Sequence, residues 1–223
     1  MFSSVLIDMK KLTDRDYFVP VKVTFWRKLF QLIFKPILYI FANIQVENPE
    51  IIPEKGAFIL AANHLSFYDG FVLQAAIRRP LFFMGKAEVF FNPVIRFFLR
   101  QVGAFPVQRG IFDRRALQQA CRVLVGGMVL SMFPEGTRTY GKGMVSAKSG
   151  TAYLALQAKC PVVPVAITGS QYILKSLPKR AFVSVKICNP IYPDEKMDAT
   201  FLTKRIMQSL AKNLPEDLRG RYS

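Results

Sequence analysis

The sequence predicts an α/β protein in which a mixed central sheet is flanked by helices and follows an N-terminal amphipathic helical segment. After Asn48, short apolar runs alternate with amphipathic stretches, a pattern typical of a largely buried sheet with helical connections. The 223 residues suffice for one sizeable core, and 51% of them are hydrophobic, more than such a core normally needs. We therefore divide the chain into an N-terminal segment, residues 1–47, and an α/β domain, residues 48–223.

The N-terminal segment is strongly apolar between Thr24 and Ala42 but does not suit a membrane span. It is interrupted by three cations and a proline, Arg27, Lys28, Lys35 and Pro36. The proline is expected to kink or divide a helix, and a spanning helix needs about 20 mostly apolar residues. We expect an interfacial helix, or a bent pair, that docks on a membrane with its cations toward headgroups and its aromatic side chains toward lipid. Those aromatic residues are Trp26, Phe30, Phe34, Tyr39 and Phe41. The alternative is a first helix that simply packs on the core.

The α/β domain contains five candidate strands and five candidate helices, with Gly and Pro at most of the joints. The candidate strands are Ala57–Ala62, Leu81–Met84, Met128–Phe133, Val162–Thr168 and Phe182–Ile187. The candidate helices are Gly70–Ile77, Asn92–Gln101, Phe112–Leu124, Gly150–Gln157 and Thr200–Asn213. Pro164 within the fourth strand suggests a sheet edge, a bulge or the first residues of a strand. That strand is expected to belong to the core, although it could also line a path for an acyl chain.

Charge and cysteine content narrow the class of partner. The net charge of +16 suits nucleic acid, an anionic membrane surface or a phosphate-bearing ligand. Basic residues are interleaved with bulky apolar ones, which favours the lipid interface over nucleic acid. Three scattered cysteines and one histidine argue against a disulfide framework or a metal site, and no cleavable signal is evident. We expect a peripheral or monotopic protein on the cytoplasmic, reducing face of a membrane.

The segment Asn63–Asp69 follows the first candidate strand of the domain and contains the chain's only histidine, His64. His64 and Asp69 would lie on opposite faces of a strand, so they can meet only if the chain turns between them. In such a turn the carboxylate can orient the imidazole while the other ring nitrogen takes a proton from an alcohol. The alternative is structural, because Ser66 and Asp69 have the spacing of a helix capping box.

The segment Phe133–Thr139 follows a buried strand, where α/β proteins commonly bind their ligands. Gly136 permits close approach of the backbone, and Arg138 offers a planar fork that suits a phosphate. Glu135 would repel a phosphate, so it is expected to bind a hydroxyl or to hold Arg138. The alternative is an exposed turn with a local ion pair, which contributes little stability.

A third segment, Gly103–Arg109, lies in a region rich in arginine, together with Lys86. Some of these cations could form an anion site, but a run of charges more often faces solvent or headgroups.

Taken in order, these segments resemble the glycerolipid acyltransferase family typified by 1-acylglycerol-3-phosphate acyltransferase. The four matching blocks are Asn63-His64-x-Ser66-x-x-Asp69, Gly103-x-Phe105-x-x-x-Arg109, Phe133-Pro134-Glu135-Gly136-Thr137-Arg138 and Val163-Pro164-Val165. Pro106 departs from the aliphatic residue that the family often has there.

The resemblance implies transfer of a fatty acyl group from a thioester to the free hydroxyl of lysophosphatidic acid in phospholipid biosynthesis. His64 would be the general base, and Asp69 would orient it. The implied substrate-binding residues are Lys86, Arg109, Glu135, Gly136 and Arg138. The donor would be an acyl-carrier protein or coenzyme A thioester, with no metal and no other cofactor, and backbone N–H groups near the turn are candidates for the oxyanion hole. The alternatives are another acceptor (a different lysophospholipid, glycerol 3-phosphate or a lyso-aminolipid) and a non-catalytic membrane-binding protein.

Overall fold

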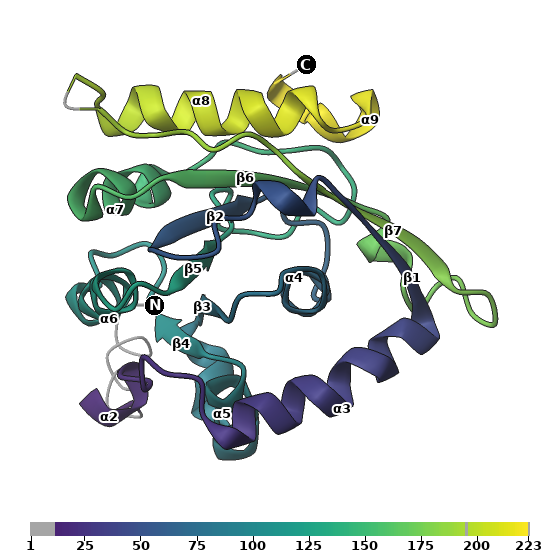
Figure 1. The fold of residues 1–223 in the computed structure, drawn as a ribbon, viewed down its shortest axis with the longest axis horizontal. Coiled ribbons are helices and arrows are strands. Elements are labelled where there is room, and N and C mark those ends of the chain that lie inside the picture. Colours follow the sequence, from purple (N-terminus) through teal and green to yellow (C-terminus); the bar gives the residue numbers. More distant parts are fainter. Residues whose placement is uncertain (1–11, 195, 223) are drawn as a thin grey trace, which may run out of the picture.

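The computed structural model describes residues 12–194 and 196–222, which form a layered α/β domain (Figure 1). A seven-stranded sheet has the order β1-β7-β6-β2-β5-β3-β4. Its strands are β1 Ala42–Glu47, β2 Phe58–Ala62, β3 Leu81–Lys86, β4 Ala104–Val107, β5 Val129–Met132, β6 Val162–Thr168 and β7 Ala181–Ile187. All neighbours pair in parallel except β6 and β7, which confirms the predicted mixed sheet.

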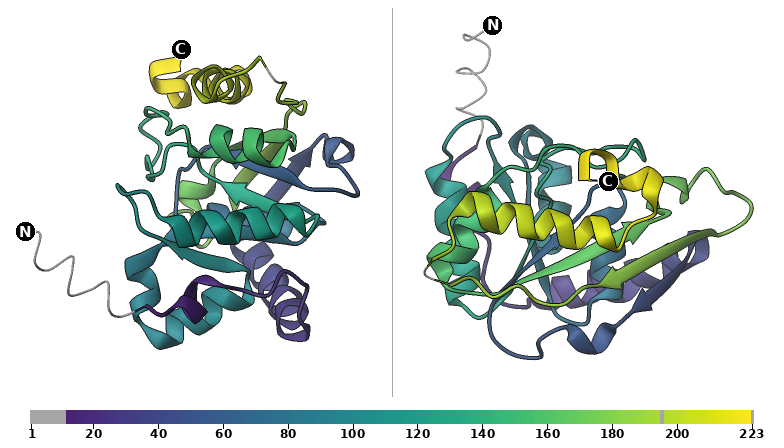
Figure 2. Two further views of the ribbon diagram at one scale, coloured as in Figure 1. Left: turned by 90° about the vertical axis from the view of Figure 1, so that its left-hand side faces the viewer. Right: turned by 90° about the horizontal axis from the view of Figure 1, so that it is seen from above.

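Helices cover both faces of this sheet. They are α2 Asp14–Tyr17, α3 Phe25–Phe41, α4 Asp69–Ala76, α5 Pro93–Gln101, α6 Arg114–Val125, α7 Gly150–Ala158, α8 Ala199–Lys212 and α9 Glu216–Arg219. Short 3-10 turns occupy Pro49–Ile51, Ala87–Phe91, Ser170–Tyr172 and Gly220–Tyr222. Seen from above, α8 runs across the strands beneath it (Figure 2).

The central strand β2 is fully buried, and its side chains alternate between two cores. Ile59 and Ala61 contribute to a core that α6, α7 and α8 also fill. Phe58, Leu60 and Ala62 contribute to a second core that includes residues of α3 and α4. Burial on both faces explains why the central parallel strands could be predicted as short apolar runs.

Two strands were not predicted, and of the positions suggested for Pro164 the structure excludes the sheet edge and places the proline among the first residues of its strand. Ala42–Glu47, assigned by sequence to the N-terminal segment, is the edge strand β1 and pairs with β7. Ala104–Val107 forms β4 at the opposite edge of the sheet. Pro164 lies in the interior strand β6, at the point where pairing with β7 stops. The regular ladder with β7 begins at Val165. Before it, the Pro164 carbonyl accepts from the Cys188 N–H, and Val162 forms an isolated antiparallel bridge with Ile191.

The expected docking segment is one helix, α3, that continues through Pro36, and its faces differ from the prediction. Phe34, Tyr39 and Phe41 pack against the core instead of facing lipid. The exposed apolar side chains are Phe25, Leu32, Ile33, Ile37 and Ile40. The side chains of Trp26 and Phe30 lie outside what the structure describes.

Arg27 was expected to face headgroups but is buried, with 2% exposure. Its Nη2 donates to the Leu81 carbonyl, and its guanidinium lies 4.3 Å from the centroid of the Phe82 ring. Burial lowers the pKa of Arg27 to about 10. Gly103 makes this position possible, because a Cβ there would lie 2.8 Å from guanidinium atoms of Arg27.

Candidate active site

The predicted motifs meet at one edge of the sheet because β2, β3, β4, β5 and β6 run in the same direction. Their carboxyl ends lead into His64, Lys86, Arg109, Glu135 and Ser170 respectively. Crevices at the carboxyl ends of parallel strands are the usual ligand sites of α/β folds.

Asn63 fixes the start of the turn after β2. Its side chain is fully buried; Oδ1 accepts from the Ile167 N–H at 2.7 Å, and Nδ2 donates to the Ile167 carbonyl at 2.9 Å. The amide thus continues the pairing of β2 with β6 past the end of the strand. The chain can then turn without leaving those backbone groups of Ile167 unsatisfied.

The turn brings His64 and Asp69 into contact, as the sequence predicted. Nδ1 of His64 lies 2.7 Å from Oδ2 of Asp69, whose side chain is fully buried, while the imidazole is 14% exposed. Because an ionised carboxylate can only accept, Nδ1 carries the proton in the neutral ring, and Nε2 is left as the basic nitrogen.

Asp69 is held by further donors from the same turn and from beyond β6. Its Oδ2 also accepts from the Leu65 N–H at 2.7 Å and the Ser66 N–H at 2.8 Å. Its Oδ1 accepts from the hydroxyls of Ser66, at 3.2 Å, and Ser170. The bond to the Ser66 N–H is the one that a capping box would make, so one carboxylate makes both the capping contact and the contact with His64.

The second motif packs directly on the histidine. The ring of Phe133 stacks on the imidazole, with centroids 4.0 Å apart and planes at 14°. The backbone carbonyl of His64 accepts from the Thr139 N–H at 2.8 Å, and the backbone N–H of His64 donates to Oε1 of Glu135 at 2.9 Å. Both the ring and the backbone of His64 are therefore positioned by residues about 70 positions away in the chain.

Glu135 has contacts that the sequence did not predict. Its side chain is 2% exposed, and its second oxygen accepts from the Val145 N–H at 2.9 Å. Burial raises the pKa of Glu135, opposed by the two N–H donors and reinforced by the charge of Asp69. Both oxygens thus hold backbone groups, whereas the expected contact of Glu135 with substrate stays a prediction.

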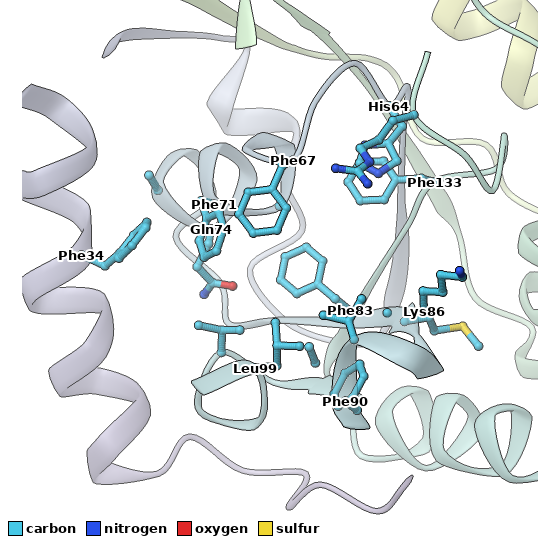
Figure 3. Close-up of a pocket in the computed structure, with 18 of the residues that line it drawn as sticks. Phe34, His64, Phe67, Phe71, Gln74, Phe83, Lys86, Phe90, Leu99 and Phe133 are labelled. Atoms are coloured by element: carbon cyan, nitrogen blue, oxygen red, sulfur yellow. The ribbon is translucent and has the colours of Figure 1, made fainter. Parts of the chain in front are cut away.

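His64 opens onto a cavity of about 440 Å³ whose walls combine cationic and apolar side chains (Figure 3). The cations that line it are Lys35, Lys86, Arg109 and Arg138. Burial lowers the pKa of Arg109, with Glu88 opposing and Arg138 adding to the shift. Lys86 pairs with Glu88 at 3.1 Å, both half exposed. The apolar walls include Phe34, Phe67, Phe71, Phe83, Phe90 and Leu99.

Four of the seven predicted site residues therefore line this cavity: His64, Lys86, Arg109 and Arg138. Asp69 lies behind the imidazole, Glu135 lies behind the turn, and Gly136 lines a second cavity. Sequence reasoning missed Ser170, although its place just after the predicted strand Val162–Thr168 could have indicated the same edge. In the part of the chain that the structure describes, no cluster of His, Cys, Asp and Glu is suited to hold a metal ion.

Comparison with known proteins agrees with this architecture. Residues 43–168 match the family model described as Acyltransferase. A 1-acyl-sn-glycerol-3-phosphate acyltransferase of Bacillus subtilis is 32% identical over 60% of this chain and 67% of its own length. The corresponding protein of Streptococcus pneumoniae is 33% identical over 67% of this chain and 56% of its own. This chain thus spans little more than half of the second relative.

The crystal structure of the 1-acyl-sn-glycerophosphate acyltransferase from Thermotoga maritima matches the fold, with a TM-score of 0.69 and 24% identity over 95% of this chain and 87% of that one. Three findings lead to one conclusion. The family model covers more than half of the chain, the relatives are named as acyltransferases, and the fold is shared. The chain belongs to the acyltransferase family typified by 1-acyl-sn-glycerol-3-phosphate acyltransferase.

Proposed function

We propose that this protein transfers a fatty acyl group from an acyl thioester to the free hydroxyl of lysophosphatidic acid, giving phosphatidic acid for phospholipid biosynthesis. The observation that carries the proposal is the His64–Asp69 pair, which opens onto a cavity that combines cations with apolar walls. The names of the relatives from Bacillus subtilis and Streptococcus pneumoniae support the same acceptor.

The chemistry needs one base and no covalent enzyme intermediate. Nε2 of His64 takes the proton of the acceptor hydroxyl while the oxygen attacks the thioester carbonyl carbon. The resulting imidazolium is stabilised by Asp69 at 2.7 Å. The tetrahedral intermediate then expels the thiolate as the carbon–sulfur bond breaks, and the proton returns from His64 to sulfur.

The cavity has groups that suit both the phosphate and the acyl chain of the substrates. Arg109 and Arg138 can bind a phosphate through their planar forks, with Lys86 as an additional point charge. The aromatic walls provide an apolar environment for an acyl chain. Holding acceptor and donor in one cavity supplies part of the rate acceleration, since the reaction then becomes effectively unimolecular.

The apolar surface near the cavity supports docking on a membrane, which we place on the cytoplasmic face. No helix in residues 12–194 and 196–222 is long and apolar enough to cross a bilayer. The exposed aliphatic side chains of α3 lie near α5, which exposes Val94, Ile95, Phe97 and Phe98. Phe34 of α3 and Leu99 of α5 both line the cavity, so a lipid could enter beside these two helices.

The test is thioester-dependent acylation of lysophosphatidic acid by the purified protein in liposomes, with His64→Ala as the comparison. Phosphatidic acid formed by the wild type and lost in the variant, with liposome binding unchanged, is the expected result. Acylation of glycerol 3-phosphate or of another lysophospholipid in its place would change the acceptor but keep the mechanism. Liposome binding by a folded wild type that consumes neither acyl-carrier protein nor coenzyme A thioester would refute the proposal.

A further inference from the structure

A second cavity, of about 460 Å³, lies next to the first. The two share Met84, Arg109 and Phe133, and the second is otherwise lined by different segments. These segments include the loop that leads from β4 to α6 and the start of α7. Gly136, predicted from sequence to bind substrate, lines this cavity and not the one at His64.

The start of α7 presents unpaired donors to this cavity. No acceptor is found, among the residues the structure describes, for the backbone N–H groups of Gly150, Thr151 and Ala152. The side chain of Ser149, the N-cap residue, accepts no hydrogen bond from the first N–H groups of the helix. These free N–H groups and the helix dipole favour an anion.

Thr151 gives an independent indication of a ligand. Its side chain is 2% exposed and lines the cavity, yet its Oγ1 has no hydrogen-bond partner in the described part of the chain. A buried hydroxyl without a partner lowers the stability of the fold, since its hydrogen bonds to water are lost without replacement. A ligand oxygen at the helix terminus would satisfy it.

The surrounding charges are also consistent with an anion. The side chain of Lys148 packs on Gly136, since a Cβ added to Gly136 would lie 3.3 Å from the Cδ and Cε of Lys148. The φ of Gly136 is +65°. Arg109 borders the cavity on the side shared with the first one. The carboxylate of Asp113 is the only one among the described lining residues, and it is occupied by the N–H groups of Gln108, Arg115 and Ala116.

We propose that this second cavity binds the phosphate of the phosphopantetheine arm that carries the acyl thioester, with Thr151, Lys148 and the first N–H groups of α7 as its ligands. Both candidate donors, acyl-carrier protein and coenzyme A, carry the thioester on this arm. Rim side chains such as Ile111, Phe112 and Tyr153 suit the aliphatic part of the arm. The acceptor phosphate is assigned to Lys86 and Arg138, which line only the first cavity. This inference rests on the proposed acyl transfer.

The test compares two donors that differ only in the phosphate, S-acyl-4′-phosphopantetheine and S-acyl-pantetheine, at saturating lysophosphatidic acid. Thr151→Val and Lys148→Gln are each expected to raise KM for the phosphorylated donor at least about tenfold, the lower end of the factor that one hydrogen bond to a charged group contributes. KM for S-acyl-pantetheine and for lysophosphatidic acid should stay unchanged. Lys142→Gln removes the same charge from an exposed position that lines none of the cavities described, and it should alter none of these constants.

Two results would overturn the assignment. A rise in KM for lysophosphatidic acid with donor KM unchanged would give the site to the acceptor phosphate, and no change in either KM would show that no phosphate binds there. A calorimetric titration of the protein with 4′-phosphopantetheine, compared with one with pantetheine, measures binding without any turnover. Tighter binding of the phosphorylated compound, lost in Thr151→Val, would uphold the site even if lysophosphatidic acid proved not to be the acceptor. Without ligand, the melting temperature of Thr151→Val should equal or exceed that of the wild type, because the substitution removes a buried hydroxyl that makes no bond within the fold.

Discussion

Replacing Asp69 by asparagine separates two contributions of its carboxylate, orientation of the imidazole and stabilisation of its charge. Oδ2 faces the ring Nδ1–H of His64 and the backbone N–H groups of Leu65 and Ser66. Oδ1 faces only hydroxyls, from Ser66 and Ser170. An N–H can only donate, whereas a hydroxyl can also accept. In Asp69→Asn we therefore expect the amide oxygen at the Oδ2 position and the NH2 group toward the hydroxyls.

With that orientation the imidazole keeps its tautomer, and only the charge is lost. Hydrogen bonds with a charged partner contribute about 1.5–3 kcal/mol and neutral ones about 0.5–1.5 kcal/mol. The difference of about 1–1.5 kcal/mol falls on the transition state, in which His64 is protonated, so kcat should drop about 5- to 13-fold. In Ser-His-Asp triads the same substitution lowers kcat about 10⁴-fold because the wrong tautomer results.

The assay is the initial rate of thiol release from the acyl thioester with saturating lysophosphatidic acid, with folding checked by thermal denaturation. Ser170→Ala in the Asp69→Asn background removes one acceptor for the new NH2 group and should lower kcat further. A loss near 10⁴-fold in the folded Asp69→Asn variant would mean that the amide nitrogen faces His64. An unchanged kcat would mean that the charge has no role in the transition state. Either result would refute this reasoning.

Three further predictions concern Arg138, Glu135 and Gly103. Arg138→Ala should raise KM for lysophosphatidic acid, since a phosphate contact is lost, and an unchanged KM in steady-state rates would contradict that role. Glu135→Gln should lower the melting temperature, because its NH2 group must face a backbone N–H. The pKa of Glu135 is raised by burial, so the stability that its proton linkage contributes is greatest below about pH 4.3 and is lost as the pH rises. The gap in melting temperature between wild type and Glu135→Gln should narrow toward neutral pH, not widen. Gly103→Ala should lower the free energy of unfolding in urea by more than the backbone strain of about 1–2 kcal/mol, because the new Cβ meets Arg27. Gly56→Ala shares a φ near +80° but has open space, so it isolates the strain, and equal losses would exclude a steric contribution.

The extent to which the fold could be predicted depended on how each element is buried. β6, buried along almost its whole length, was predicted at its observed bounds because its apolar run is uninterrupted by charge. β1 was missed because it is a half-exposed edge strand that continues directly from the apolar helix α3. The buried side of α3 was assigned wrongly because apolar residues occupy most of its circumference, and periodicity does not show which of them pack on the core.

The site residues were predictable where a motif places them on a strand end, but their contacts were not. His64 and Asp69 are close in sequence, so a single turn was enough to predict their meeting. The bond from the His64 N–H to Glu135 joins residues 71 positions apart, and no local pattern indicates it. Such contacts depend on which strand ends become neighbours, and that is set by the order of the sheet.

The same contacts limit where an oxyanion can be stabilised. Backbone N–H groups of the turn were the candidates from sequence, yet those of His64, Leu65 and Ser66 all donate to buried carboxylates. A group already bonded to a carboxylate has little left to give a developing oxyanion. The cations of the first cavity then become candidates for this role as well as for phosphate binding. Arg109→Ala and Arg138→Ala distinguish the two: loss of a phosphate contact raises KM, whereas loss of an oxyanion contact lowers kcat with KM unchanged.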